Sequence, residues 1–311
     1  MNPTPNSSNH SPILPTFIGI GAARSGTTWL SHWLSQHPDI WIPHLKELHY
    51  FSRSSKYFST SFLGQASLPR RLFGRDTRSK EFHRQLARAI GRNIRHPSSE
   101  RLRWEWKYFL SEVSDEWYES LFVGRPEPIT GEITPAYALL DDADAANMQR
   151  QLPNTKFLYI MRDPVDRAWS SIRYHEKRSG SQLTSMSASD IEKHLSNDAI
   201  VGRSDFAGTI QRWRQALPQE RFWLGFYDDI VKDPIRMLTG VYEFLGADVE
   251  AVGRDALKEI NQKVNDSTAK EMPVNIRRFL SQQYLPALER LAKDMHGWPE
   301  KWYQDALTAA G

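Results

Sequence analysis

A stretch near the start of the chain combines the residue types of an anion-binding site. Residues 17–20 form an apolar run that predicts a buried strand. Residues 21–26 form a small-residue loop, and apolar side chains recur at helical spacing from Trp29 to Leu34. Glycines let a backbone approach a ligand closely, and the first N–H groups of a helix have no intrahelical acceptor. The order strand, glycine loop, helix therefore predicts that an anion binds at the end of this strand.

The loop differs in its cation from the phosphate loops of nucleotide triphosphatases. Gly21 and Gly26 have the G-x-x-x-x-G spacing, but Thr27 stands where those enzymes keep a lysine. Arg24 is the nearest cation. A terminal phosphate with Mg²⁺ would lack its usual lysine, whereas a sulfonate carries less charge and needs no metal to neutralise it. A tight turn that merely requires glycine is the alternative interpretation.

A second stretch places an arginine at the end of a predicted strand. Residues 157–161 are apolar, Asp163 suits a helix N-cap, and Pro164 suits the first helical position. Arg162 therefore lies at the carboxyl end of the strand, where the ligands of parallel sheets bind. Its guanidinium suits a phosphate because it forms paired, charge-assisted hydrogen bonds.

A third stretch follows a short apolar run at residues 40–42. It contains Lys46, Glu47 and His49, which combine a cation, a carboxylate and an imidazole. Because functional loops of open α/β sheets lie at strand ends, this segment is a candidate for acid–base chemistry. On residue types alone, an ordinary polar loop with aromatic anchors is the simpler interpretation.

At these residues the chain resembles the sulfotransferases that use 3′-phosphoadenosine 5′-phosphosulfate (PAPS). Residues 24–28 match their phosphosulfate loop, [KR]-x-G-T-T, and residues 162–170 match R-D-P-x-x-R-x-x-S, with which the family binds the 3′-phosphate of the donor. The best-known branches have lysine at the first loop position; arginine keeps the charge but cannot give up a proton. The resemblance implies that the donor contacts Arg24, Ser25, Gly26, Thr27, Thr28, Trp29, Arg162 and Ser170.

The resemblance also implies a catalytic apparatus. Residues 46–51 match K-E-x-H-[FY]-F of the heparan-sulfate and bacterial carbohydrate branch, in which the glutamate is the catalytic base. Carried over, Glu47 takes the proton of the acceptor, His49 assists it, and Lys46 with Arg24 stabilises the sulfonate. Ile133 replaces the substrate-binding lysine of the heparan enzymes, which weakens the case for a heparan-like substrate. Lys263 lies where the family closes a loop on the donor.

The expected fold is α/β: a P-loop-type parallel sheet with helices on both faces. We expect a disordered tail at residues 1–14 and a single domain at 15–311 with a basic helical insertion near 70–103. That segment has eleven Lys and Arg and three Asp and Glu, a local charge of +8 in a chain of net charge +3. An amphipathic helix is predicted at 80–90, with Phe82 and Ile90 on its apolar face. A solvated face or an electrostatic funnel for an anionic substrate explains its charge.

Composition narrows the remaining possibilities. The chain has 311 residues, 40% of them hydrophobic, and no cysteine. It has no apolar run of membrane-spanning length and no signal-peptide pattern, which favours a cytoplasmic, bacterial enzyme. No nucleic-acid-binding signature and no metal-ligand spacing are present, so we expect neither a nucleic-acid partner nor a metal. The sequence does not predict an oligomeric state.

The functional hypothesis is transfer of a sulfonate from PAPS to a hydroxyl, with adenosine 3′,5′-bisphosphate (PAP) as the product. The acceptor would be a carbohydrate or another small hydroxylated molecule, and the +8 segment favours an anionic one. An amine acceptor ranks below a hydroxyl. Two alternatives stay open: a P-loop kinase that uses ATP, and a non-catalytic protein that binds an anion or a glycan.

Overall fold

The computed structural model describes residues 14–57, 61–64, 67–179, 203–253, 259–260 and 271–311, without the side chains of 175–179. The predicted tail at 1–14, apart from Leu14, and the candidate donor residue Lys263 therefore lie outside the described residues. The chain divides into two compact units. One contains residues 60–126 together with 1–15, and the other contains residues 16–59 and 127–311.

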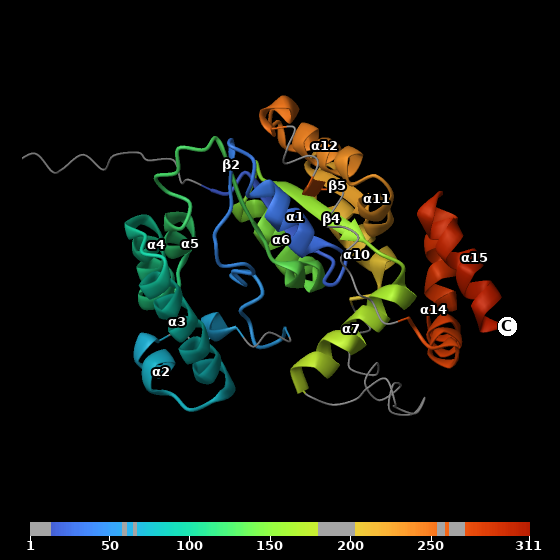
Figure 1. Cartoon of the computed structure of the whole chain (residues 1–311), viewed down its shortest axis with the longest axis horizontal. Helices are drawn as coiled ribbons and strands as arrows, with labels where there is room; N and C mark the ends of the chain where they lie inside the picture. Colours follow the sequence, from blue (N-terminus) through green and yellow to red (C-terminus); the bar gives the residue numbers. More distant parts are fainter. Residues whose placement is uncertain (1–13, 58–60, 65–66, 180–202, 254–258, 261–270) are drawn as a thin grey trace, which may run out of the picture. The chain divides into compact units, whose positions relative to one another are not determined.

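The larger unit is built on one parallel sheet of five strands (Figure 1). Its order is β2-β3-β1-β4-β5, and the strands are β1 (Phe17–Gly21), β2 (Ile40–Trp41), β3 (Ile129–Ile133), β4 (Lys156–Met161) and β5 (Phe222–Phe226). Every residue of β1 and β3 is buried, as expected for strands that are covered on both faces. The predicted strands at 17–20 and 157–161 are confirmed.

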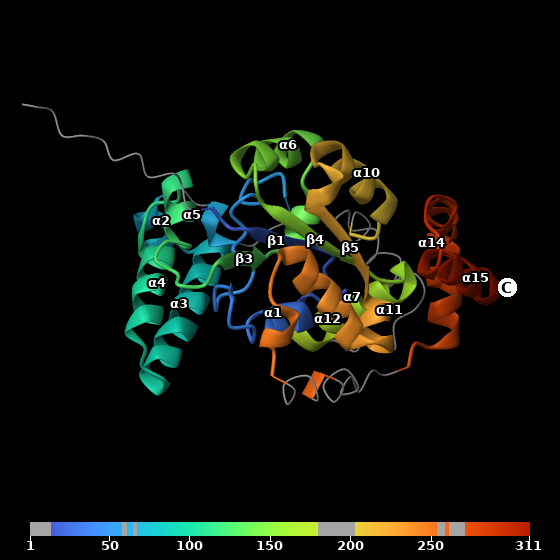
Figure 2. The ribbon, with the colours of Figure 1, turned by 90° about the horizontal axis from the view of Figure 1, so that it is seen from above.

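Helices cover both faces of this sheet, as predicted (Figure 2). On one face, α1 (Thr27–Leu34) and α12 (Pro234–Leu245) share a core with the strands, and the Tyr242 hydroxyl donates to the Trp33 carbonyl at 3.1 Å. On the other face lie α6 (Asp142–Gln151) and α10 (Phe206–Ala216), where the ring of Trp213 contacts that of Phe157. Because all strands are parallel and neighbouring, their carboxyl ends meet at one edge of the sheet.

Four more α-helices in the described part of this unit follow the fourth and fifth strands. They are α7 (Pro164–Ser179), α11 (Tyr227–Lys232), α14 (Val274–Asp294) and α15 (Trp298–Ala310). Asp163 caps α7, because its carboxylate accepts from the Val165 N–H at 2.8 Å, as its position before Pro164 predicts. The indoles of Trp298 and Trp302 donate to Asp229 and Asp228, which connects the last helix to α11.

The smaller unit is helical and carries the basic segment. Its helices are α2 (Leu68–Phe73), α3 (Thr77–Arg95), α4 (Ser99–Leu110) and α5 (Asp115–Ser120). Phe62, Phe82 and Phe109 pack together in its core. The expectation that Ile90 joins this apolar face is wrong: its side chain is 52% exposed. In the described part of the chain, no helix of either unit has the length and apolar character needed to cross a membrane.

Candidate active site

The loop between β1 and α1 is shaped by glycine. Gly26 is the N-cap of α1 and has φ +87° and ψ +6°, a left-handed conformation that side chains disfavour. A Cβ at this position would lie 2.6 Å from Cδ1 of Ile230 and 3.2 Å from Cδ2 of Tyr227. Gly26 has no side chain with which to cap the helix, and the first N–H groups of α1 have no intrahelical acceptor. This geometry leaves N–H donors at the start of α1, where the sequence predicts an anion site.

Arg24 connects the loop to α7. Its Nε donates to Oγ of Ser170 at 3.3 Å, and its guanidinium lies over the ring of Tyr174 at 4.7 Å. Burial lowers the pKa of Arg24; Tyr174 acts in the opposite direction, and the charges of Arg162 and Arg173 lower the pKa further. Two residues from distant motifs are thus in contact, within a cluster of cations.

Arg162 joins the same cluster from the end of β4. Its Nη1 donates to the Arg24 carbonyl at 3.2 Å, and its guanidinium lies 4.3 Å from the centre of the Tyr227 ring. Its Nε is buried without a hydrogen-bond partner among the described residues, as is the hydroxyl of Ser25. Buried donors without a partner are costly, so an acceptor supplied to these two atoms would stabilise the protein. The residues predicted to hold the two ends of the donor therefore lie together.

Lys46 brings a lysine ammonium to the loop, in which Thr27 occupies the lysine position of nucleotide triphosphatases. Its ammonium donates to the hydroxyls of Thr28 at 2.8 Å and Thr27 at 3.3 Å, at the first turn of α1. Burial lowers the pKa of Lys46, Glu47 raises it, and Arg24 lowers it. A lysine therefore lies beside the loop, although it comes from a segment that follows β2.

Glu47 and His49 flank the fully buried Leu48, which anchors their segment. Both have positive φ, +66° and +59°. Nε2 of His49 lies 3.5 Å from Oε2 of Glu47, and its Nδ1 lies 3.1 Å from Oγ of Ser52. Burial raises the pKa of Glu47, but the hydrogen bond and charge of His49 and the charges of Lys46 and Arg203 outweigh this, so the pKa lies below its ordinary value. The Glu47 side chain is 43% exposed and thus reachable by a hydroxyl.

Residues 131–137 contact the segment 46–51. The carboxylate of Glu132 is buried and accepts hydrogen bonds from the hydroxyls of Thr134 at 2.7 Å and Tyr137 at 3.1 Å. The Tyr137 ring contacts the Phe51 ring edge-on at 5.6 Å between centroids. Glu132 is therefore bound within the scaffold that positions residues 46–51.

Sequence reasoning missed two residues that contact the predicted ones: Tyr174, whose ring lies against Arg24, and Tyr227, whose ring lies against Arg162. Tyr227 directly follows β5, so the rule that parallel-sheet ligands bind at strand ends could have identified it. The Nε atoms of Arg173 and Arg203 are buried without a hydrogen-bond partner among the described residues. The ring of Trp29, a residue predicted to contact the donor, packs against the core. Its backbone N–H lies in the first turn of α1.

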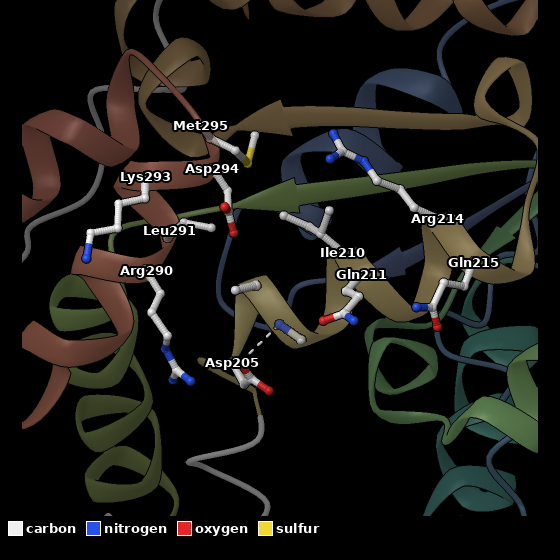
Figure 3. A pocket seen from close by; sticks show the side chains of 12 residues that line it. Asp205, Ile210, Gln211, Arg214, Gln215, Arg290, Leu291, Lys293, Asp294 and Met295 are labelled. Carbon is white, nitrogen blue, oxygen red and sulfur yellow. Dashed lines mark hydrogen bonds between the residues drawn. The ribbon is translucent and has the colours of Figure 1, made fainter.

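Two further observations concern the surroundings of the site. Within the described ranges, no group of three or more His, Asp or Glu side chains could hold a metal ion. A cavity of about 790 Å³ between α10 and α14 is lined by Asp205, Arg214, Arg290 and Asp294, among others (Figure 3). It contains none of the predicted site residues.

Comparisons with known proteins show what this chain is similar to. The profile of the sulfotransferase family matches residues 15–251. The membrane-associated sulfotransferase kil1 of Dictyostelium discoideum is 27% identical over 162 residues, which are 52% of this chain and 23% of that protein. The chain thus spans less than a quarter of this relative's length.

The fold is also that of a solved enzyme. The crystal structure of a sulfotransferase from Alicyclobacillus acidocaldarius superposes with a TM-score of 0.61 at 22% identity, and the match covers 93% of this chain and 98% of that one. At this identity the likeness concerns the fold, whereas the family profile covers both the loop and the 162–170 motif. This chain belongs to the sulfotransferase family.

Proposed function

We propose that this protein transfers a sulfonate from PAPS to the hydroxyl of a small-molecule or glycan acceptor. The observation that carries the proposal is the contact between the two donor motifs: Arg24 binds Ser170 through its side chain and Arg162 through its carbonyl. Motifs 138 residues apart thereby converge on the uncapped start of α1. A nucleotide with phosphate groups at both ends of its ribose is the ligand that such an arrangement fits.

The residues fit this donor in their chemistry. Gly26 lets the backbone approach the phosphosulfate, and the N–H groups of residues 26–28 donate to it together with Lys46 and Arg24. Arg162 and Ser170 bind the 3′-phosphate, and the Tyr227 ring holds the guanidinium of Arg162 in place. The partnerless Nε of Arg162 and hydroxyl of Ser25 gain acceptors when the donor is present.

Glu47 acts as the general base in this proposal. Its carboxylate accepts the proton of the acceptor hydroxyl while that oxygen attacks the sulfur, the new O–S bond forms, and the bond from sulfur to the bridging oxygen breaks. His49 holds the carboxylate in position. Lys46 and Arg24 stabilise the negative charge on the sulfonate and on the departing PAP, as cations do in phosphoryl transfer.

A thermal-shift titration with PAP, AMP and ATP–Mg²⁺ tests the donor site. A ligand that binds only the folded state stabilises it by about 2.7 kcal/mol at one hundred times its dissociation constant. We expect PAP to raise the melting temperature without Mg²⁺ and AMP to raise it little. Stabilisation by ATP–Mg²⁺ alone would favour the kinase.

Matched variants make this titration specific. Arg162→Gln should remove the preference for PAP over AMP, because it removes the fork that binds the 3′-phosphate. Arg212→Gln loses the same charge at a surface ion pair with Asp142 and should keep the preference. If PAP binds but labelled PAPS transfers no sulfonate to any of a broad set of hydroxyl acceptors, a non-catalytic binding protein becomes the better conclusion.

A further inference from the structure

Two neighbouring helices of the smaller unit carry large apolar side chains that are exposed. On α3, Ile90 and Ile94 are one turn apart, and their side chains are 52% and 75% exposed. On α4, Leu102 and Trp106 are one turn apart, and their side chains are 53% and 65% exposed. Single exposed apolar side chains are ordinary in proteins, but four that gather on one side of two adjacent helices form an apolar patch.

The two helices lie side by side and run antiparallel (Figures 1 and 2). Asn93, near the end of α3, donates to the carboxylate of Glu105 on α4. Phe82, near the start of α3, contacts the ring of Phe109, which is further along α4. As the residue number falls along α3, it therefore rises along α4. The same contacts identify the side of each helix that faces the other.

The four exposed apolar side chains lie on one side of this helix pair. Ile94 and Trp106 each directly follow a residue that faces the other helix, so each is rotated from that direction by about 100° in the same sense. Because the helices are antiparallel, rotation in the same sense leads to the same side of the pair. Ile90 and Leu102 lie one turn earlier on their helices and share this side. These four residues are called the α3–α4 face below.

Cations follow the apolar residues of the α3–α4 face in the sequence. Those that directly follow Ile94, Leu102 and Trp106 are Arg95, Arg103 and Lys107. All three are exposed, and none forms an ion pair with a described carboxylate. The glutamates of the two helices pair instead with Arg84, Arg92 and Arg125. The face therefore combines an apolar centre with a positive rim, in a segment whose local charge is +8 over residues 70–103.

The acidic helix α5 packs against another side of α4. The indole of Trp104 on α4 donates at 3.0 Å to the carbonyl of Leu121, the C-cap residue of α5. Trp104 precedes Trp106 by two residues, which is a rotation of about 200° around the helix. Helix α5 therefore lies on the opposite side of α4 from Trp106, and the α3–α4 face keeps its positive rim.

We propose that the α3–α4 face docks this protein on a membrane whose lipids have anionic headgroups. The four apolar side chains enter the boundary between headgroups and acyl chains, and the cations stay at the level of the headgroup phosphates. Tryptophan suits this depth because its ring is apolar and its N–H is polar. Each cation near an anionic surface adds to the attraction. This inference does not depend on the donor site.

A membrane fits this face better than a protein or a nucleic acid does. A second copy of the chain would bring two positive faces together, and like charges repel. A stable protein–protein interface contains about 20–30 residues on each side, many more than this face offers, whereas a bilayer needs no matching shape. A nucleic acid would bind the cations but leave the aliphatic side chains of Ile90, Ile94 and Leu102 without a partner.

Vesicle sedimentation tests the proposal on the full chain. The protein is mixed with vesicles of phosphatidylcholine alone, or of phosphatidylcholine with phosphatidylglycerol, and the bound fraction gives a partition coefficient. We expect the vesicles with phosphatidylglycerol to bind the protein at least about tenfold more strongly than those without it. High salt should weaken this binding because it screens the attraction between the cations and the headgroups.

Variants connect the binding to the α3–α4 face. Ile94→Ser and Trp106→Ser should each weaken it about tenfold, because an apolar side chain no longer leaves water. Arg103→Gln should weaken it about fivefold, because one cation is lost. Val274→Ser removes a side chain that is 77% exposed on α14, and Arg212→Gln removes a cation from α10. Both controls should bind as the parent does, and melting temperatures show that every variant is folded.

Three results would overturn the proposal. The first is a parent protein that does not bind vesicles containing phosphatidylglycerol. The second is binding that Ile94→Ser, Trp106→Ser and Arg103→Gln all leave unchanged, because another surface is then responsible. The third comes from light scattering: if the parent is a dimer and Trp106→Ser is a monomer, the face joins two copies of the chain.

Discussion

Replacing Gly26 by alanine tests whether the loop geometry depends on glycine. At φ +87° the new residue adopts the left-handed conformation, which costs about 1–2 kcal/mol. Its Cβ would also lie 2.6 Å from Cδ1 of the buried Ile230, well inside the usual carbon–carbon contact, and overpacking of this kind costs about 1–3 kcal/mol. We therefore expect Gly26→Ala to lower the free energy of unfolding by about 2–5 kcal/mol.

A double-mutant cycle separates the two contributions. Ile230→Val removes Cδ1 and by itself costs about 0.5–1.5 kcal/mol. In that background, Gly26→Ala should cost the backbone strain and the milder contact with Tyr227 at 3.2 Å, so the coupling energy should be about 1–3 kcal/mol. Gly246→Ala is the matched control, because Gly246 has φ +85° and nothing lies within 4 Å of its added Cβ.

Urea unfolding followed by tryptophan fluorescence measures these free energies, and a PAP titration measures the consequence for binding. The methyl group also lies 3.2 Å from Tyr227, whose ring supports Arg162, so Gly26→Ala should weaken PAP binding and Gly246→Ala should not. The reasoning is refuted if Gly26→Ala costs the same in both backgrounds, or no more than Gly246→Ala.

Three further predictions concern titratable groups. Glu47→Gln should lower kcat by about 10²–10⁴-fold and leave the PAP-induced thermal shift intact; parent-like turnover would exclude Glu47 as the base. Because the pKa of Glu47 lies below its ordinary 4.5, the midpoint of the decline of kcat/KM in acid should lie below pH 4.5, and Arg203→Gln should move this midpoint to higher pH; an unmoved pH–rate profile would contradict the coupling. Burial raises the pKa of Asp163 from 3.8 to about 7, so the folded state keeps a proton that the unfolded state loses. The free energy of unfolding of the parent should therefore fall by up to about 4 kcal/mol relative to that of Asp163→Asn as the pH rises from about 4 to about 7, and the difference should stay constant above pH 7. Urea unfolding across this pH range measures the difference. A difference that does not change with pH would contradict the prediction.

The elements of the fold could be predicted because their signals are local. Apolar runs, glycines and the Asp163-Pro164 pair mark where strands end and helices begin, and these signals act within a few residues. The two donor motifs follow strands β1 and β4, so a parallel sheet necessarily brings them to one edge. Arg24 and Arg162 were predicted at the ends of these strands and Ser170 from the resemblance to the family, and the structure places Arg24 in contact with both of the others.

Other features depend on neighbours that are distant in the sequence. Helical periodicity assigned Ile90 to the apolar face of α3, but which side of a helix is covered depends on the helices packed against it, and Ile90 is exposed. The division of the chain into two compact units also depends on the distribution of contacts. Local periodicity contains no information about either.

The sequence by itself determined the α/β architecture, the glycine loop and the cations that follow the strands, because backbone preference and hydrophobic periodicity are properties of short segments. Only the tertiary structure decided how these groups are combined. It placed the Lys46 ammonium on the hydroxyls of Thr27 and Thr28, and the Arg162 guanidinium over the ring of Tyr227. Hydrogen bonds and charge interactions act over a few ångströms in space, and the distance between two residues in space is set by the packing of the whole unit rather than by their separation along the chain.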